Sequence, residues 1–285
     1  YKRIITDYAA LTGAPMAAVA RHGHDFSYRG MSGSEDAAQS GMGHLTSFIG
    51  TDSVVAIDYA ENYYGGDEVI GVSVPATEHS VMCMGTQENE IDTFRRLIVD
   101  TYPTGIVSIV SDTWDFWKVI TEYALELKDE IMARQPNDIG LNKVVFRPDS
   151  GNPADILCGI QVKTVRTEAP LDLQDWKEWV AEEMDIEFCN NLDAEDPHSS
   201  ETTFYQYEGQ TYEVTYEPDL NRHDKTYYYV DNWGSTVSKC TFKEITLTPE
   251  QKGAVQCLWD IFGGTTTETG HKLLDEHVGL IYGDS

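Results

Sequence analysis

Charged and polar side chains recur in this sequence where short apolar segments give way to loops. The clearest case is VVFRPDSGNP, in which three apolar residues of strand character run into Arg147 and then Asp149. A guanidinium binds phosphate oxygens through paired N–H groups, and a carboxylate binds hydroxyl groups or Mg²⁺. The pattern indicates either a site for a ligand with anionic and hydroxyl groups or an ion pair or Asx turn local to the loop.

Similar polar groups follow other apolar segments. They are Ser73 and His79, Ser108 and Asp112, and Gly283 and Asp284. Loops nearer the start, HDFSYRG and GTDS, add Arg29 and Asp52. The carboxyl ends of parallel strands meet at one edge of a sheet, where ligands bind in such folds. Taken singly, His79 also suits a hydrogen-bonded structural role, and Ser108 suits a small residue inside a strand. Only their recurrence favours a site.

Apolar strands alternate with amphipathic helices through most of the chain. The predicted strands are residues 69–74, 106–110, 144–146 and 278–282, and the predicted helices are residues 88–102, 116–131 and 249–262. The last helix has a capping box, Thr248-Pro249-Glu250-Gln251, and a Gly-Gly stop. This alternation is typical of an α/β protein with a parallel sheet covered by helices. An open doubly wound sheet and a (β/α) barrel both fit it.

One long segment breaks the alternation. Residues 158–247 contain an acidic helix candidate at 173–184 and then tyrosine-rich stretches with Gly and Pro, which favour antiparallel hairpins. We expect three parts: residues 1–157 as the first part of the α/β domain, 158–247 as a small inserted α+β lobe, and 248–285 as the continuation of the domain.

The formal net charge of −28 opposes binding to nucleic acid and to anionic membranes. The acidic run in residues 167–201 is typical of a solvated face. Five cysteines form no CxxC pair, which favours a reducing compartment such as the cytoplasm. No signal peptide is recognisable, and no apolar run approaches the ~18 residues of a membrane-spanning helix.

Six segments together resemble the nicotinamide phosphoribosyltransferases. They are HDFSYRGMSG, HLTSFIGTDSV, GVSVPATEHSVM, SIVSDTWDFW, FRPDSGNP and GHKLLDEHVGLIYGDS. SVPATEHS and RPDSGNP are the most specific of them. The resemblance skips the inserted lobe and implies a partial (β/α) barrel of the type II phosphoribosyltransferase kind, working as a homodimer. It also implies transfer of a phosphoribosyl group from phosphoribosyl pyrophosphate to nicotinamide, with Mg²⁺, in NAD salvage.

The resemblance also assigns roles to individual residues. Phe26 is expected to stack on the nicotinamide ring, and Asp52 to accept a hydrogen bond from its amide. His79 matches a histidine that is phosphorylated by ATP in the family. His79 and Asp149 are the two residues expected to be catalytic. The other expected substrate contacts are Arg29 and Arg147 for phosphate or amide oxygens, Asp149 and Asp284 for ribose hydroxyls, Ser108 in the nicotinamide pocket, Asp112 on the phosphate and Mg²⁺ side, and Ser73 and Gly283.

A carboxylate at Asp52 accepts an amide NH₂ but repels the carboxylate of nicotinate, which favours nicotinamide. A protonated Asp52 would accept either base, so nicotinate phosphoribosyltransferase is the alternative. Two other interpretations stay open: a glycoside hydrolase using two strand-end carboxylates, which leaves Arg29 and Arg147 without purpose, and a non-catalytic binding module.

The sequence also departs from the resembled family. Members continue past both ends of this sequence, with an aromatic residue on one side and a glycine-rich phosphate loop on the other. We therefore expect this chain alone to be inactive. Gly279 stands where animal members have an arginine.

Overall fold

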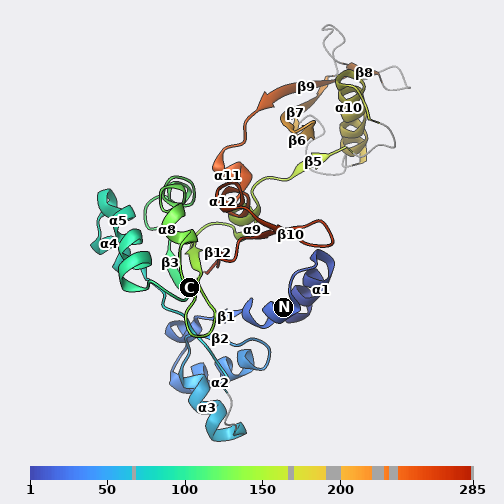
Figure 1. The fold of residues 1–285 in the computed structure, drawn as a ribbon. Helices are drawn as coiled ribbons and strands as arrows, with labels where there is room; N and C mark the ends of the chain where they lie inside the picture. Colours follow the sequence, from blue (N-terminus) through green and yellow to red (C-terminus); the bar gives the residue numbers. More distant parts are fainter. Residues whose placement is uncertain (66–68, 166–169, 191–199, 220–227, 231–236, 284–285) are drawn as a thin grey trace. The chain divides into compact units, whose positions relative to one another are not determined.

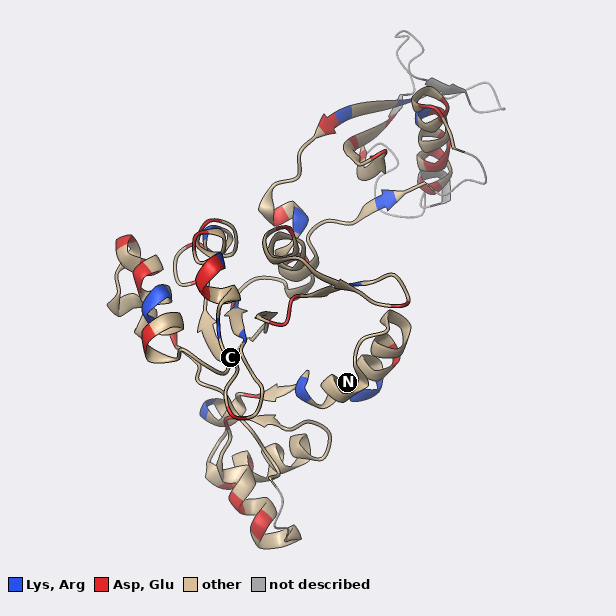
Figure 2. Cartoon of the chain, in the orientation of Figure 1, with Lys and Arg blue, Asp and Glu red and all other residues tan. Residues whose placement is uncertain are grey.

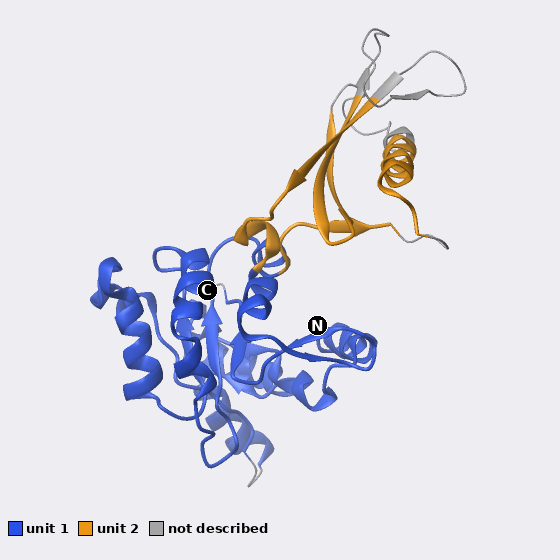
Figure 3. Cartoon of the chain, turned by 45° about the horizontal axis from the view of Figure 1, so that its top comes forward, with its two compact units in different colours: residues 1–157, 254–285 blue, residues 158–253 orange. Residues whose placement is uncertain are grey.

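The chain folds into two units, coloured separately in Figure 3. Unit 1 comprises Tyr1–Leu157 and Ala254–Ser285, and unit 2 comprises Cys158–Gly253. The computed structural model describes residues 1–65, 69–165, 170–190, 200–219, 228–230 and 237–283, and Figure 1 follows them along the chain. Each unit mixes helices with strands around an apolar core of its own, so the α/β class expected from the sequence is confirmed.

Parallel pairing organises the strands of unit 1. Strand β4 (Val144–Arg147) lies between β3 (Val107–Val110) and β12 (Val278–Leu280), and all three run parallel. A second parallel pair joins β1 (His24–Asp25) to β2 (Gly50–Thr51). All of β3 and most of β4 are buried, which explains their unbroken apolar sequence. The three predicted strands that correspond to β3, β4 and β12 are therefore confirmed.

The predicted buried strand at residues 69–74 is wrong. Val69 is 81% exposed, and Val72 alone pairs with β2, through a bridge to Gly50. The segment changes partner within a few residues, because Ala76 pairs in parallel with Ser108 on β3 instead. The intervening Pro75 has no N–H to donate to a ladder. The segment thus runs parallel to both neighbours without being a regular strand.

Helices cover the strands of unit 1 and supply most of its core. In chain order they are α1 (Lys2–Thr12), η1 (Met16–Arg21), η2 (Ser27–Gly30), α2 (Ser34–Leu45), α3 (Val55–Tyr64), α4 (His79–Met84), η3 (Gln87–Asn89), α5 (Glu90–Arg95), η4 (Arg96–Thr101), α6 (Phe116–Lys118), η5 (Val119–Tyr123), α7 (Ala124–Glu126), α8 (Lys128–Met132), α9 (Pro153–Cys158) and α12 (Ala254–Phe262). The helices predicted at 88–102 and 116–131 are confirmed, each with a π-helical segment (η4, η5). Their apolar faces pack with β3 and β4 in one cluster.

The helix predicted at residues 249–262 is broken in two. The capping box of Thr248 and Gln251 forms as expected and starts α11 (Pro249–Lys252). Gly253 then adopts φ +80°, so the chain leaves the helix before α12 begins. After α12, an antiparallel hairpin of β10 (Gly264–Thr266) and β11 (Lys272–Leu274), which the sequence analysis did not predict, leads to β12.

The described residues of unit 2 form a five-stranded sheet and one long helix. The sheet order is β5-β6-β7-β9-β8, formed by β5 (Val162–Thr164), β6 (Glu201–Tyr207), β7 (Gln210–Asp219), β9 (Val237–Ile245) and β8 (Tyr228–Val230). The helix α10 (Leu173–Asn190) buries Trp176, Val180 and Met184 against tyrosines of the sheet. The predicted antiparallel hairpins and acidic helix are confirmed, and Figure 2 shows the acidic residues along α10.

No helix in the described part of the chain is both long enough and apolar enough to cross a lipid bilayer.

Candidate active site

Parallel pairing brings the carboxyl ends of six segments of unit 1 to one edge. The pairs run from β1 to β2, then through residues 72 and 76 to β3, and on to β4 and β12. Each segment ends in a loop that carries polar residues. The predicted site residues that follow these ends are Phe26 and Arg29, Asp52, His79, Asp112, Asp149, and Gly283, and Ser73 lies within the segment that contains residues 72 and 76. Arg147 is the last residue of β4 itself.

Asp112 joins the loop after β3 to the loop after β4. Its Oδ2 accepts hydrogen bonds from the backbone N–H of Asp149 at 2.9 Å and from the Ser150 hydroxyl at 2.6 Å. Its Oδ1 lies 3.3 Å from Nε2 of His79, whose Nδ1 is 4.0 Å from Asp149 Oδ2. The Asp112 side chain is only 7% exposed, whereas that of His79 is 43% exposed. Three predicted residues therefore form one cluster in which Asp112 positions the other two.

Arg147 does not form the local ion pair with Asp149 that its sequence pattern also allowed. It is 6% exposed, and its Nη2 donates to the backbone carbonyl of Thr77 at 2.5 Å. Its Nε has no hydrogen-bond partner, and no carboxylate pairs with it in the described part of the chain. Its guanidinium carbon lies 5.9 Å from the centre of the Phe26 ring. A buried cation without a counter-ion is costly, so this arrangement favours an anionic ligand.

A second cluster forms around Asp52 at the ends of β1 and β2. Oδ1 of Asp52 accepts a hydrogen bond from the Ser73 hydroxyl and lies 3.0 Å from Nε2 of His24. The His24 ring stacks on Phe26 with ring centres 4.4 Å apart and planes inclined by 25°. Phe26, Asp52 and Ser73, three predicted residues, are therefore brought together by His24, which the sequence analysis did not single out.

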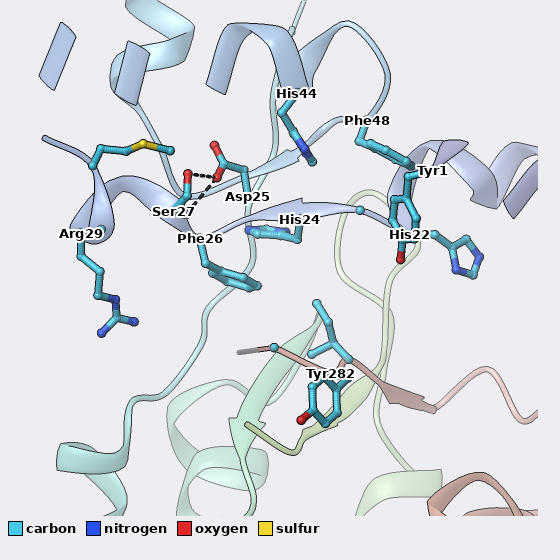
Figure 4. A pocket seen from close by; sticks show the side chains of 15 residues that line it. Tyr1, His22, His24, Asp25, Phe26, Ser27, Arg29, His44, Phe48 and Tyr282 are labelled. Carbon is cyan, nitrogen blue, oxygen red and sulfur yellow. Dashed lines mark hydrogen bonds between the residues drawn. The ribbon is translucent and has the colours of Figure 1, made fainter. Parts of the chain in front are cut away.

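Beside this cluster lies a cavity of about 570 Å³. Figure 4 shows its lining, with His24 and Phe26 of the β1 segment on one side and Tyr282 on another. Asp25 is held at its wall by hydrogen bonds from Ser27 N and Oγ at 2.9 and 2.7 Å. Burial acts to raise the pKa of Asp25, but the hydrogen bonds from Ser27, together with the influence of Ser53 and of the nearby His44, lower it overall. The wall thus carries a fixed negative charge.

The remaining predicted residues take different places. Arg29 lines the cavity and pairs with Glu78 at 3.0 Å, with 63% of its side chain exposed. Gly283 also lines it and donates its N–H to the carbonyl of Pro148. Ser108 is 4% exposed, holds Pro75 and Thr77 through its backbone, and does not line the cavity. Asp284 lies outside the described residues.

Two contributors to the site were missed from the sequence. His24 stands two residues before Phe26, a spacing that puts side chains on the same side of an extended segment, and this signal was available in the sequence. Thr77 was not detectable, because it contributes a backbone carbonyl to Arg147. A second cavity of about 270 Å³ adjoins Asp112 and is lined in part by Trp114 and Trp117.

No group of three or more His, Cys, Asp or Glu side chains in the described ranges is arranged to hold a metal ion. Mg²⁺ at phosphate sites is usually held by one or two carboxylates together with the phosphates of the substrate. Asp112 and Asp149 bring two carboxylates to the strand-end edge, a donor type that suits a Mg²⁺ ion arriving with a phosphorylated ligand.

The chain is an α/β protein whose strand-end edge gathers a buried guanidinium, several carboxylates and an aromatic ring. The sequence profile of the nicotinate phosphoribosyltransferase (NAPRTase) family matches residues 22–184. This segment contains β1 to β4 and all predicted site residues except those at 283 and 284. The chain belongs to the nicotinate phosphoribosyltransferase family.

Comparison with individual proteins gives a narrower likeness. The chain is 48% identical over its whole length to a nicotinamide phosphoribosyltransferase of Acinetobacter baylyi, of which it covers 40%. It is 36% identical over 55% of its length to a nicotinamide phosphoribosyltransferase of Xanthomonas campestris pv. campestris, covering 32% of that protein. A third similar protein, from Mycoplasma pneumoniae, has the same name, with 38% identity over 47% of this chain and 26% of its own length. The chain thus spans less than half the length of these relatives.

Proposed function

We propose that this chain is part of a nicotinamide phosphoribosyltransferase, a pentosyltransferase of NAD salvage. The reaction joins the pyridine nitrogen of nicotinamide to the anomeric carbon of phosphoribosyl pyrophosphate, while the bond from that carbon to pyrophosphate breaks. The products are nicotinamide mononucleotide and pyrophosphate. The relatives of the same printed name, the first of them similar along the whole chain, support this choice.

The buried guanidinium of Arg147 is the observation that carries the proposal. It has one hydrogen bond to a carbonyl, an unpartnered Nε–H and no carboxylate partner in the described part of the chain. A phosphate oxygen satisfies both the charge and the donor. Because Phe26 lies beside it, the same ligand would carry a phosphate next to a flat aromatic group. A phosphoribosyl group joined to a pyridine has both.

The other residues divide between the base and the sugar. Phe26 offers a ring for stacking on the pyridine, and Asp52 offers a carboxylate to its amide. Asp149, anchored through its backbone to Asp112, would accept hydrogen bonds from ribose hydroxyls, with Asp284 in the same role. Arg29 would reach a phosphate by leaving Glu78. These groups would raise the rate by orienting two substrates that react poorly with each other and by stabilising the charges that separate as the bond to pyrophosphate breaks.

Mg²⁺ would be held by Asp112 or Asp149 together with the pyrophosphate of the substrate. Its chemistry there is to neutralise the charge that develops on the leaving pyrophosphate. His79 offers a partly exposed imidazole between two carboxylates, which supports a role as acceptor of a phosphoryl group. In that step ATP would transfer its terminal phosphoryl group to a ring nitrogen of His79 and leave as ADP.

Nicotinate is the alternative base, because the matching family profile has nicotinate in its name. Asp52 is the residue on which the choice depends. One of its oxygens already accepts from Ser73 and faces His24, so it presents negative charge toward the base. Negative charge favours the amide of nicotinamide and repels the carboxylate of nicotinate.

The broader context belongs to the same proposal. The sequential parallel pairing of unit 1 supports a partial (β/α) barrel of the type II phosphoribosyltransferase kind. A homodimer with shared active sites and a cytoplasmic location are proposed with it. The thiols of Cys83, Cys158 and Cys240 form no disulfide, which supports a reducing compartment. The net charge of −28 supports neither nucleic acid nor a membrane as a partner.

The test uses the complete protein with phosphoribosyl pyrophosphate, Mg²⁺ and either nicotinamide or nicotinate. Formation of nicotinamide mononucleotide, lost in Arg147→Met and reduced in Arg147→Lys, is the expected result, because lysine keeps the charge without the forked donor geometry. Product mainly from nicotinate would be consistent with the family assignment but would overturn the argument from Asp52. Absence of product from both bases would refute the proposed function.

A further inference from the structure

The carboxylate of Asp52 is held at one oxygen and open at the other. Oδ1 accepts the Ser73 hydroxyl and lies 3.0 Å from Nε2 of His24. Because an ionised carboxylate only accepts hydrogen bonds, Nε2 carries the proton in this contact. In the described part of the chain Oδ2 accepts no hydrogen bond, and 40% of the side chain is exposed. Oδ2 is therefore directed to a ligand by two donors that fix its partner oxygen.

His24 is itself held in place. Its side chain is 12% exposed, and its ring stacks on Phe26. On its other edge the chain comes close at Gly50: a Cβ atom there would lie 2.7 Å from Nδ1 of His24. The carbonyl of Gly50 in turn accepts from His44 at 2.9 Å. The imidazole thus fits between a glycine backbone and an aromatic ring, with one N–H aimed at Asp52.

We propose that His24 is a positioning and specificity-determining residue for the base. Its ring sets the plane of Phe26, and its Nε2–H, together with the Ser73 hydroxyl, fixes the orientation of Asp52, so one side chain links the two groups that contact the base. A flat heteroaromatic ring with a neutral N–H donor then matches the site, whereas a carboxylate on that ring meets Asp52 as a like charge. This inference rests on the proposed function and adds the residue that sets the choice between amide and acid.

Two substitutions of His24 distinguish loss of its hydrogen bond to Asp52 from a general disturbance of the fold. In His24→Gln the side-chain amide nitrogen lies near the position of Nε2 and can donate to Asp52. In His24→Asn the same amide is one methylene shorter and cannot reach it. Loss of one hydrogen bond to a charged group corresponds to roughly a tenfold change in an equilibrium constant. The matched control is His271→Ala, an exposed histidine in the loop between β10 and β11.

The experiment measures kcat and KM of the complete protein for nicotinamide and for nicotinate at saturating phosphoribosyl pyrophosphate. We expect His24→Asn to raise KM for nicotinamide about tenfold and to lower the nicotinamide-to-nicotinate ratio of kcat/KM by a similar factor. His24→Gln should recover most of that ratio, and His271→Ala should leave it unchanged. An unchanged ratio in His24→Asn would overturn the inference. So would a lower KM for nicotinamide, because it would mean that His24 occupies the place of the base.

A spectroscopic measurement keeps the inference independent of activity. The imidazole ¹⁵N signals of His24 report which ring nitrogen carries the proton, and Asp52→Ala should shift the Nε2 signal. If the wild-type protein made no mononucleotide from either base, the proposed function would fail, while this spectrum would still decide the contact. An Nε2 signal that does not respond to Asp52→Ala would overturn the inference even in an active enzyme.

Discussion

Replacement of Asp112 by alanine removes the link between the loops that follow β3 and β4. In the native protein Oδ2 accepts from Asp149 N at 2.9 Å and from Ser150 Oγ at 2.6 Å, and Oδ1 lies 3.3 Å from His79. Asp112→Ala deletes all three contacts at once. Asp112→Asn keeps the shape and one oxygen, which can still accept the two bonds now made to Oδ2, but it removes the charge that faces His79.

The magnitude follows from the number of bonds and from their exposure. A hydrogen bond to a charged group contributes about 1.5–3 kcal/mol, and an unsatisfied buried partner costs about 1–3 kcal/mol. Ser150 is exposed and can turn to water, whereas Asp149 is only partly exposed. We therefore expect Asp112→Ala to lower the free energy of unfolding by about 2–3 kcal/mol and Asp112→Asn by less than about 1 kcal/mol.

The assay pairs urea unfolding with steady-state kinetics of the complete protein. In Asp112→Ala, kcat/KM for phosphoribosyl pyrophosphate should fall about 100-fold, because Asp149 is no longer oriented, while KM for nicotinamide changes little. The matched control is Asp115→Ala in the same loop. Asp115 is exposed, and in the described part of the chain its carboxylate accepts one hydrogen bond, from the N–H of Lys118, so the substitution should cost about 1 kcal/mol and leave the kinetics unaltered. Equal effects of Asp112→Ala and Asp115→Ala on both measurements would refute the reasoning.

Three further predictions concern stability. Burial raises the pKa of Glu90 to about 7, so the folded state keeps a proton that the unfolded state releases above its ordinary value of 4.5. The free energy of unfolding should fall by on the order of 2 kcal/mol between pH 4.5 and about 7. Urea unfolding at several pH values should show a flatter profile for Glu90→Gln than for the native protein. An equally steep profile in the variant would contradict this role of Glu90. Arg134 is 5% exposed and donates to the carbonyls of Ile98, Tyr102 and Gly105. Arg134→Met should therefore lower the free energy of unfolding by about 2–4 kcal/mol in thermal or urea unfolding. The control Arg3→Met, at an exposed arginine, should change it by almost nothing. Trp176 is 2% exposed and contacts four aromatic rings of unit 2. Trp176→Ala should therefore lower the free energy of unfolding of that unit by about 3–5 kcal/mol. A loss below about 1 kcal/mol would mean that the unit has another core.

Local sequence was sufficient where an element depends on its own residues. The apolar run that forms β3 is buried at every position, so burial on both faces was readable as a continuous apolar stretch. The capping box of Thr248 and Gln251 formed as the pattern predicted, because its bonds join residues three apart. The segment at residues 69–74 has equally strong strand character, but the strand predicted there is wrong. Its pairing depends on which neighbour lies beside each residue, and that neighbour changes at Pro75.

The same distinction holds for the site. The sequence by itself determined which residue types stand at the strand ends, and with them the polar set around Asp112, Arg147 and Asp149. It also predicted the separation of the tyrosine-rich, acidic segment from the α/β unit, since alternating and helical periodicities differ within a few residues. These properties depend on composition and on short-range spacing alone.

Only the tertiary structure decided how those residues combine. The sequence offered Arg147 and Asp149 as an ion pair, but the fold turns Arg147 toward the carbonyl of Thr77 and anchors Asp149 on Asp112. It also placed His24 between Phe26 and Asp52, residues that follow the ends of two different strands, β1 and β2. The physical reason is that hydrogen bonds and ring contacts act over a few ångströms. Partners 28 to 70 residues apart meet only after parallel pairing has brought their strands together.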